Sequence, residues 1–253
     1  MTGALVQCGA IGTFLVLGTV FARNKGQGLV NRDTIINVTN GALLFGLRLA
    51  VIAGALQWLD SGVVDASSIA NPWVQFGLAF VMLDFSRYWL HRAHHRVPFL
   101  WSFHRVHHMS ERLDATSGLR MHVVDFVQLA FLPSVLFGAL LNTSAWSGWS
   151  IAAALSVGAV FDAFQHANIR WNADGALGRV WGRVLNNPHF HAWHHTRDGS
   201  DCDGNYGNTL VIWDRMFGSV VTQPELPEAF GLEASQAIEN SLLSMQMLRR
   251  RAG

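Results

Sequence analysis

All twelve histidines of this 253-residue chain lie between His91 and His195. Three groups stand out among them, with the sequences HRAHH at 91–95, HRVHH at 104–108 and HAWHH at 191–195. Histidines three or four residues apart lie on one face of a helix, and a neutral imidazole offers a lone pair to a borderline transition metal. Each group can present two or three ligands to one place, which predicts a metal site.

The sequence excludes several common metal sites. No glutamate lies inside any of the three groups, as an HExxH metalloprotease would require, and the cysteine pairs of a structural zinc finger are absent. The chain has only two cysteines, Cys8 and Cys202, whereas an iron–sulfur cluster takes four ligands. Any electrons for redox chemistry therefore have to come from another protein.

The composition indicates that this site belongs to a membrane protein. Half of the residues are hydrophobic and only 14% are charged, which is too apolar for an ordinary soluble domain of this size. Residues 4–21 carry no charge and approach the ~20 residues that a helix needs to cross the hydrocarbon core. A cleaved signal peptide is the alternative, but no Lys or Arg precedes the apolar run.

Further apolar segments predict about four to five transmembrane helices in one integral-membrane domain over residues 1–253. After the first span come residues 41–59, which include Arg48, residues 65–84, and a helical hairpin over residues 126–161. The fold class expected is therefore all-α, a polytopic helical membrane domain with a histidine-rich helical cap.

The distribution of Lys and Arg predicts the orientation of the chain. The loops at 60–65 and 142–147 contain neither residue, so the positive-inside rule places these loops on the far side and the histidine groups on the cytoplasmic side. Cys8 and Cys202 then lie on opposite sides of the membrane and cannot pair. The net charge of +1 gives no reason to expect a nucleic-acid partner.

The motifs carry a resemblance to a known family. The stretches LDFSRYWLHRAHHRVPFLWSFHRVHH, FQHANI and HAWHHTRDGSDCDGNYGNTLVIWDRMFGS resemble the fatty acid hydroxylase and sterol desaturase superfamily of integral-membrane, non-haem di-iron enzymes. HxxxH, HxxHH and a last HxxHH occur in order, with the NYG and WDRxFG tail after them. The resemblance implies a catalytic region over residues 80–220, two iron ions, for which zinc can substitute in purified samples, and dioxygen-dependent hydroxylation or desaturation of a lipid.

Position by position, the resemblance implies ten histidine ligands. They are His91, His95, His104, His107, His108, His122, His166, His191, His194 and His195. Many relatives have a proline directly after the histidine at position 122 and a glutamate three residues on, whereas this chain has Val123 and Asp125 there. His94 and His189 occupy variable positions and are expected to be exposed or to lie behind the ligands.

Carboxylates are expected to orient the ligands, because ten neutral histidines leave the charge of two dications largely uncompensated. An acid that accepts the free ring N–H of a ligand fixes the orientation of its ring. The candidates are Asp125 and Asp162, which lies one helical turn before His166, together with Asp84 and Asp198. For Asp84 and Asp198, a role as a helix-end or solvated acid is the alternative.

The function expected is that of a membrane-bound di-iron oxygenase, which hydroxylates or desaturates a C–H bond of a lipid with O2. Its electrons would come from a separate donor of the ferredoxin or cytochrome type, and its expected location is a bacterial inner membrane. Two alternatives stay open. One is a membrane metal-binding or metal-transport protein without oxygenase activity, whose ligands should be distributed through the spans; the other is a structural zinc site.

Overall fold

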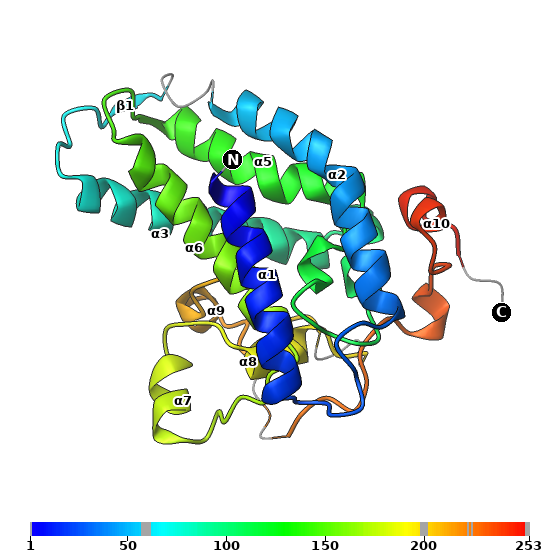
Figure 1. Ribbon diagram of the computed structural model, residues 1–253. Coiled ribbons are helices and arrows are strands. Elements are labelled where there is room, and N and C mark those ends of the chain that lie inside the picture. The colour runs from blue at the N-terminus through cyan, green and yellow to red at the C-terminus, as the bar shows by residue number, and fades with distance from the viewer. Residues whose placement is uncertain (1, 57–61, 198–201, 222, 224, 251–253) are drawn as a thin grey trace.

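The computed structural model describes the chain except for residues 1, 57–61, 198–201, 222, 224 and 251–253, and it is mostly helical, as predicted (Figure 1). Five long helices form its body: α1 (Thr2–Val20), α2 (Arg32–Leu56), α3 (Pro72–Arg96), α5 (Val123–Leu140) and α6 (Gly148–His166). The short helices are α4 (Pro98–His104), α7 (Ala176–Trp181), α8 (Pro188–His194), α9 (Ile212–Met216) and α10 (Leu242–Met247). Single 3-10 turns are η1 (His107–Met109), η2 (Ser117–Leu119) and η3 (Ala234–Gln236), and the two-residue strands β1 (Val64–Asp65) and β2 (Leu141–Asn142) pair in parallel.

Helix α3 lies between the two arms that the sequence predicted as a hairpin. It packs against both α5 and α6, while α1 packs on α6 and α2 on α5. The core between α3 and its neighbours contains Ala79, Leu83, Phe137 and Ala154, all buried. The small side chains of Ala79 on α3 and Ala154 on α6 let these two helices approach closely. The apolar surface buried between the helices stabilises their packing. The pattern of apolar residues predicted the two arms and an apolar segment over residues 65–84, but it did not predict that the helix formed by this segment lies between the arms.

The boundaries of two long helices differ from the predicted apolar segments. Helix α2 starts at Arg32, well before residue 41, and its first turns bury polar side chains such as Asn37 and Asn40 against a loop. Helix α3 starts at Pro72, where the Asn71 side chain accepts the Trp73 N–H at 2.9 Å, and continues to Arg96. The hydropathy of the sequence does not reveal these helix ends, because the polar residues there form hydrogen bonds with other protein groups rather than with water.

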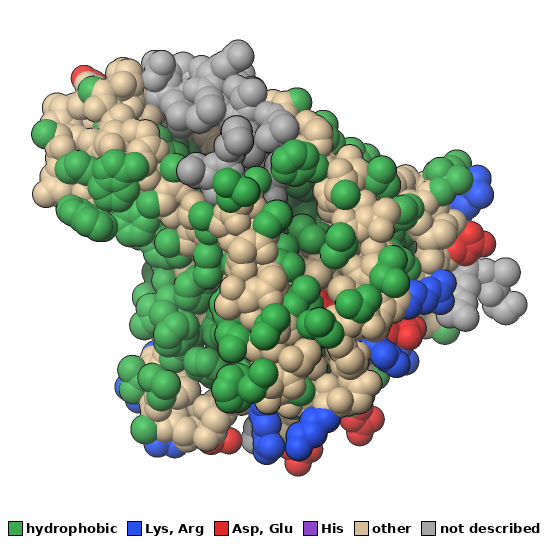
Figure 2. Space-filling model, in the orientation of Figure 1, with side chains coloured by type: hydrophobic (Ala, Val, Ile, Leu, Met, Phe, Trp, Pro, Cys, Tyr) green, Lys and Arg blue, Asp and Glu red, His purple; other side chains and the backbone are tan. Residues whose placement is uncertain are grey.

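Among the residues that the structure describes, α5 is long and apolar enough to cross a membrane, and α1 contains the shorter apolar stretch Ala4–Val20. Large apolar side chains are exposed on the long helices, for example Leu5 on α1, Leu43 on α2 and Trp73 on α3. In Figure 2 apolar side chains spread over these helices, whereas charged side chains gather at the lower and right-hand edges. The number of spans and the cytoplasmic cap stay predictions.

A buried ion pair holds the loop of residues 105–122 against α2. Arg120 is fully buried, and its Nη2 donates to Oδ1 of Asp33 at 2.6 Å while its Nε donates to Oδ1 of Asn37 at 2.6 Å. The second oxygen of Asp33 accepts the backbone N–H groups of Glu111 and Arg112, both at 3.1 Å. A buried charge is tolerated only when it is paired and hydrogen-bonded. The network therefore fixes the loop that carries His107 and His108.

Asp33→Asn keeps the shape of the side chain but leaves Arg120 buried without its counter-ion. We expect a loss of about 3–5 kcal/mol of stability, measured as a lower thermal unfolding midpoint of the detergent-purified protein. Asp174→Asn, at an exposed acid, is the matched control and should change stability by about 0.5 kcal/mol or less. Equal midpoints for the two variants would show that the ion pair does not hold the loop.

Candidate metal centre

Nine of the ten predicted ligands come together in two neighbouring clusters. The five-histidine cluster consists of His91, His95, His104, His108 and His194, and the four-histidine cluster of His107, His166, His191 and His195. Within each cluster the candidate ligand atoms all lie within 4.8 Å of one another. The rings of His108 and His195, one from each cluster, stack with centroids 4.4 Å apart, so the clusters are adjacent.

Helix ends from distant parts of the sequence bring these rings together. The end of α3 supplies His91 and His95, and α6 ends at His166. Helix α3 ends before Val97, whose backbone is extended, and Pro98 begins α4 in a new direction. The second histidine motif therefore lies beside the first. Helix α8 and the residue after it carry the third motif.

The pairs that share a cluster are spaced four residues apart. His91 and His95, and likewise His104 and His108, lie in the five-histidine cluster, whereas His191 and His195 lie in the four-histidine cluster. Residues four apart on a helix point the same way. In the second and third motifs the remaining histidine, His107 or His194, belongs to the other cluster. Each of these motifs therefore contributes to both clusters.

Two ring tautomers of the four-histidine cluster, those of His166 and His107, are fixed by hydrogen bonds on the outer side. Nδ1 of His166 donates to the carbonyl of Asp162 at 2.6 Å, and Nδ1 of His107 donates to the carbonyl of Arg120 at 3.3 Å. A carbonyl only accepts, so in each neutral ring the proton sits on Nδ1 and the lone pair on Nε2. These two Nε2 atoms are 3.2 Å apart, with no proton between them.

The same arrangement recurs in the five-histidine cluster. Nδ1 of His91 donates to the carbonyl of Tyr206 at 2.8 Å, and Nδ1 of His104 donates to a carboxylate oxygen of Asp125 at 3.1 Å. The Nε2 atoms of His91 and His104 face one another at 3.1 Å. Two lone pairs held this close repel each other unless a cation lies between them.

The spacing of the nitrogens matches that of ligands around a metal ion. Nε2 of His166 lies 3.0 Å from Nε2 of His191 and 3.2 Å from Nε2 of His195, and the latter two are 3.1 Å apart. Metal–nitrogen bonds of ~2.0–2.1 Å separate tetrahedral ligands by about 3.3 Å. The residues present therefore fit a divalent transition metal in this cluster.

Burial keeps the rings in the neutral form that metal binding requires. Removal from water, with a further contribution from neighbouring histidines, lowers the pKa of His107 to about 3. The same causes lower the pKa of His108, His194 and His195 well below the ordinary value. A protonated imidazole has no lone pair to donate, so the fold preserves the lone pairs at neutral pH.

The structure does not bring His122 to either cluster. The residue is the N-cap of α5, where its Nδ1 accepts the backbone N–H of Val124 at 3.1 Å and its Nε2 donates to the carbonyl of Gln246 at 2.9 Å. Both ring nitrogens are therefore engaged. His94 lies behind the five-histidine cluster, with its Nδ1 donating to the carbonyl of Leu90, and His189 contacts the carbonyl of Gln223.

The four candidate carboxylates have different positions. Asp125 is fully buried and contacts His104, while a carboxylate oxygen of Asp162 lies 3.7 Å from Nδ1 of His166, whose N–H is taken by the Asp162 carbonyl. Asp84 is remote from the ring nitrogens; it accepts N–H groups from residues 209, 210 and 213. Asp198 lies outside the described residues.

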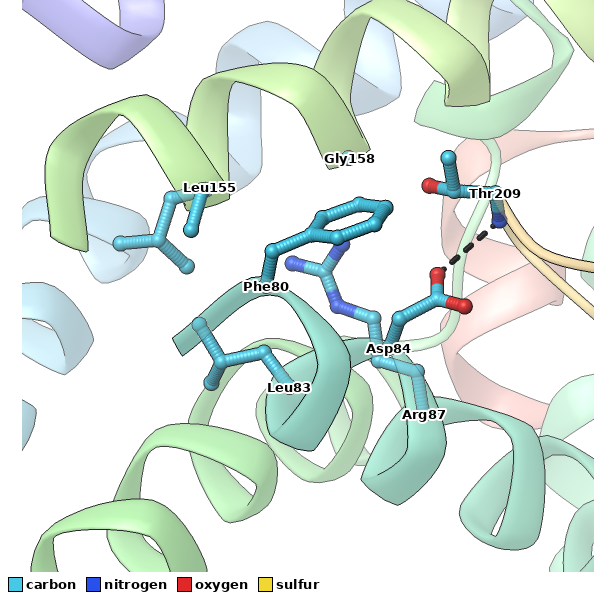
Figure 3. A pocket seen from close by; sticks show the side chains of 8 residues that line it. Phe80, Leu83, Asp84, Arg87, Leu155, Gly158 and Thr209 are labelled. Atoms are coloured by element: carbon cyan, nitrogen blue, oxygen red, sulfur yellow. Dashed lines mark hydrogen bonds between the residues drawn. The ribbon is translucent and has the colours of Figure 1, made fainter. Parts of the chain in front are cut away.

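Figure 3 shows the surroundings of Asp84, where α3 faces α6 and the loop that carries Thr209. The Asp84 carboxylate accepts the Thr209 N–H at 3.0 Å, and beside it a cavity of about 10 Å³ lies between Phe80, Arg87 and Gly158. Gly158 has no side chain, which leaves room for the Arg87 guanidinium against α6. Asp84 thus ties α3 to the loop after the third motif.

Sequence reasoning missed the acceptors that come from the backbone. The carbonyls of Gly204 and Tyr206 accept Nδ1–H of His194 and His91, each at 2.8 Å. The loop that presents them is held by Asp214, which accepts the N–H groups of Tyr206 and Gly207 at 2.8 Å each. The NYG and WD residues of the family tail were the available signal, since they form this scaffold.

Comparisons with known proteins agree with the motif resemblance. The family model described as fatty acid hydroxylase matches residues 76–219. An alkylglycerol monooxygenase of Xenopus tropicalis is 35% identical over 61% of the chain and 32% of its own length. An ornithine lipid hydroxylase of Rhizobium tropici is 31% identical over 59% of the chain and 43% of its own length.

A more distant relative is a putative Delta(7)-sterol-C5(6)-desaturase of Arabidopsis thaliana, 27% identical over 57% of the chain and 47% of its own length. The matched region thus spans less than half the length of these curated relatives. No solved structure matches the chain. The family model covers more than half of the chain, including both histidine clusters, and the chain therefore belongs to the fatty acid hydroxylase family.

Proposed function

We propose that the chain is a membrane-bound, non-haem di-iron oxygenase that hydroxylates a C–H bond of a lipid with O2 and externally supplied electrons. The observation that carries the proposal is the pair of adjacent histidine clusters in which Nε2 lone pairs converge at 3.1 and 3.2 Å. Imidazole ligands suit divalent iron and zinc, and membership of the fatty acid hydroxylase family favours iron.

In this proposal each cluster holds one iron ion. The iron pair supplies the activation of dioxygen that an unactivated C–H bond requires, which no side chain can provide alone. The protein holds the ions through neutral rings and orients several of them, such as those of His91, His104 and His166, through their Nδ1–H acceptors. Every ring except that of His91 is buried, which limits its contact with bulk water. Zinc fits the same ligands and outcompetes ferrous iron, so iron has to be loaded under controlled conditions.

A lipid substrate is supported by what the relatives are named for. Alkylglycerols, ornithine lipids and sterols are all amphipathic lipids with long or bulky apolar parts. Hydroxylation is preferred to desaturation because the more similar relatives are a monooxygenase and a hydroxylase. The electrons would come from a separate ferredoxin- or cytochrome-type protein.

We place the chain in a membrane, expected to be a bacterial inner membrane, with the histidine clusters on its cytoplasmic side. Support comes from the apolar helix α5, from exposed apolar side chains on α1 and α3, and from the gathering of charges away from them in Figure 2. A lipid could then approach the clusters from the bilayer without crossing water.

The rival function, transport of metal ions, fits the histidine positions less well. A transport path needs ligands along the spans, whereas the clusters use the ends of α3 and α6 together with α4, η1 and α8. Helix α5, which is apolar enough to span a membrane, contains no histidine.

Metal content tests the assignment of ligands. After anaerobic loading with Fe²⁺, the protein should hold two ions, and His191→Ala, which removes a ligand of the four-histidine cluster alone, should hold about one. His122→Ala is the matched control and should keep both, because its ring nitrogens are engaged elsewhere. Loss of an ion in His122→Ala, or two tightly held ions in His191→Ala, would overturn this division of ligands.

Asp125→Asn tests the carboxylate that orients His104. An amide oxygen is a weaker acceptor for the ring N–H, so we expect iron affinity in the five-histidine cluster to fall by about 10–100-fold, measured by competition with a chelator of known affinity. Asp162→Asn is the control with a smaller expected effect, since the backbone carbonyl of Asp162 accepts the His166 proton and stays in place. Equal losses in both variants would contradict the difference in their roles.

Turnover tests the reaction itself. Iron-loaded protein, supplied with a reductase system and ¹⁸O2, should place one labelled oxygen atom in a lipid from an extract of its host membrane, detected by mass spectrometry. His191→Ala should reduce this incorporation by about a hundredfold or more, in the range of losses for essential catalytic groups. Lipid products without the label, or turnover that persists after iron removal, would refute the proposal.

A further inference from the structure

A cavity of about 210 Å³ borders the five-histidine cluster and has no part in the function proposed above. His95 and His108 line it from the cluster, and Cys202, Asp203 and Glu233 line it from the polar loops around them. A cavity of this volume holds several water molecules. It therefore gives small hydrated solutes a place beside the cluster.

Three different donor groups converge in the wall of this cavity. The imidazole of His95, the thiol of Cys202 and the carboxylate of Asp203 offer ligand atoms that all lie within 4.8 Å of one another. Nδ1 of His95 is 3.6 Å from Oδ1 of Asp203. Nitrogen, sulfur and oxygen at this separation form a ligand set that the two histidine clusters do not contain.

The outer nitrogen of His95 distinguishes this histidine from His91 and His104 in the same cluster. Nδ1 of His91 and Nδ1 of His104 each donate to an acceptor at hydrogen-bond distance. Nδ1 of His95 is buried, in a side chain that is 1% exposed, and has no hydrogen-bond partner among the described residues. A buried polar atom left unpaired costs about 1–3 kcal/mol. A ligand at this nitrogen would remove that cost.

We propose that His95, Cys202 and Asp203 form a separate site for a thiophilic divalent cation, such as Zn²⁺ or Cd²⁺, which the cavity supplies with water as a further ligand. Thiolate selects such ions over Mg²⁺ and Ca²⁺, and zinc commonly combines Cys, His and Asp ligands in a four-coordinate shell. Binding releases two protons to water, that of the Cys202 thiol and that on Nδ1 of His95, because the ring already gives the lone pair of its other nitrogen to the five-histidine cluster. The His95 ring then bridges the two ions as an imidazolate, and the Cys202 thiolate and the Asp203 carboxylate add their negative charges to the new ion.

The charged neighbour of the site leaves one carboxylate oxygen available. Arg96 lies on the surface, with its Nη1 3.4 Å from Oδ2 of Asp203 and its Nη2 donating to the Asp203 carbonyl at 3.1 Å. The other oxygen, Oδ1, is the one that approaches His95. Arg96 thus orients Asp203 for the cation.

An ion in this site shares the His95 ring with the cluster beside it. The ion binds Nδ1 of a ring whose other nitrogen serves the five-histidine cluster, and it stands in the cavity that reaches His95 and His108. Its charge therefore acts directly on one ligand of that cluster. The site makes the protein sensitive to thiophilic ions, whichever metal the histidine clusters hold.

Cadmium binding to the full-length, detergent-purified protein with its histidine clusters filled with Fe²⁺ tests the proposal. Cadmium bound to a thiolate has an ultraviolet charge-transfer band that cadmium bound to histidine lacks, and the chain has only two cysteines. We expect one equivalent of this band in the unchanged protein and in Cys8→Ser, none in Cys202→Ser, and an affinity weakened about tenfold or more in Asp203→Asn.

The matched cysteine variants make the result decisive. Cys8 is exposed on α1, far along the chain from the cavity, so a band that vanishes in Cys8→Ser or survives in Cys202→Ser would overturn the site. Absence of the band at saturating Cd²⁺ would overturn it as well. Unchanged iron content in Cys202→Ser shows that this variant is folded. The readout needs no turnover, so failure of the oxygenase proposal would leave its interpretation intact.

Discussion

The structure depends on lone pairs that are forced to face one another. Rings such as His91, His104 and His166 give their Nδ1 proton to a fixed acceptor, so their Nε2 atoms turn inward without a proton. Burial prevents the simplest relief, which would be protonation. A cation bound between the nitrogens removes the repulsion that results. The fold creates such a site in each of the two adjacent clusters.

The acceptors that impose this arrangement come from segments far apart in sequence. Tyr206 is presented by a loop that Asp214 holds, and the Arg120 carbonyl belongs to a loop that the Arg120–Asp33 ion pair holds against α2. Metal binding is consequently coupled to the packing of the whole helical body, since an unfolded chain would not hold nine rings together. A residue that binds no metal, such as Asp33, therefore helps to position the ligands of the metal centre.

Local spacing predicted a metal site and the family resemblance implied ten histidine ligands, but neither predicted which histidine lies in which cluster. Histidines three or four residues apart were expected to lie on one face of a helix; this holds for His91 and His95, whereas His191 and His194 lie in different clusters. The separation of His107 from His108 depends on the 3-10 turn after α4, and the position of His122 depends on its role as the N-cap of α5. Both are consequences of where helices end, which spacing does not reveal.

X-ray absorption at the iron edge of the anaerobically loaded protein tests the central claim most directly, because it reports the atoms bound to the ions. Converging imidazoles predict a first shell dominated by nitrogen at about 2.0–2.2 Å, with the multiple scattering of several imidazole rings per iron and two irons per chain. A first shell that contains sulfur, or one dominated by carboxylate oxygen, or a single iron per chain at saturation, would contradict the account.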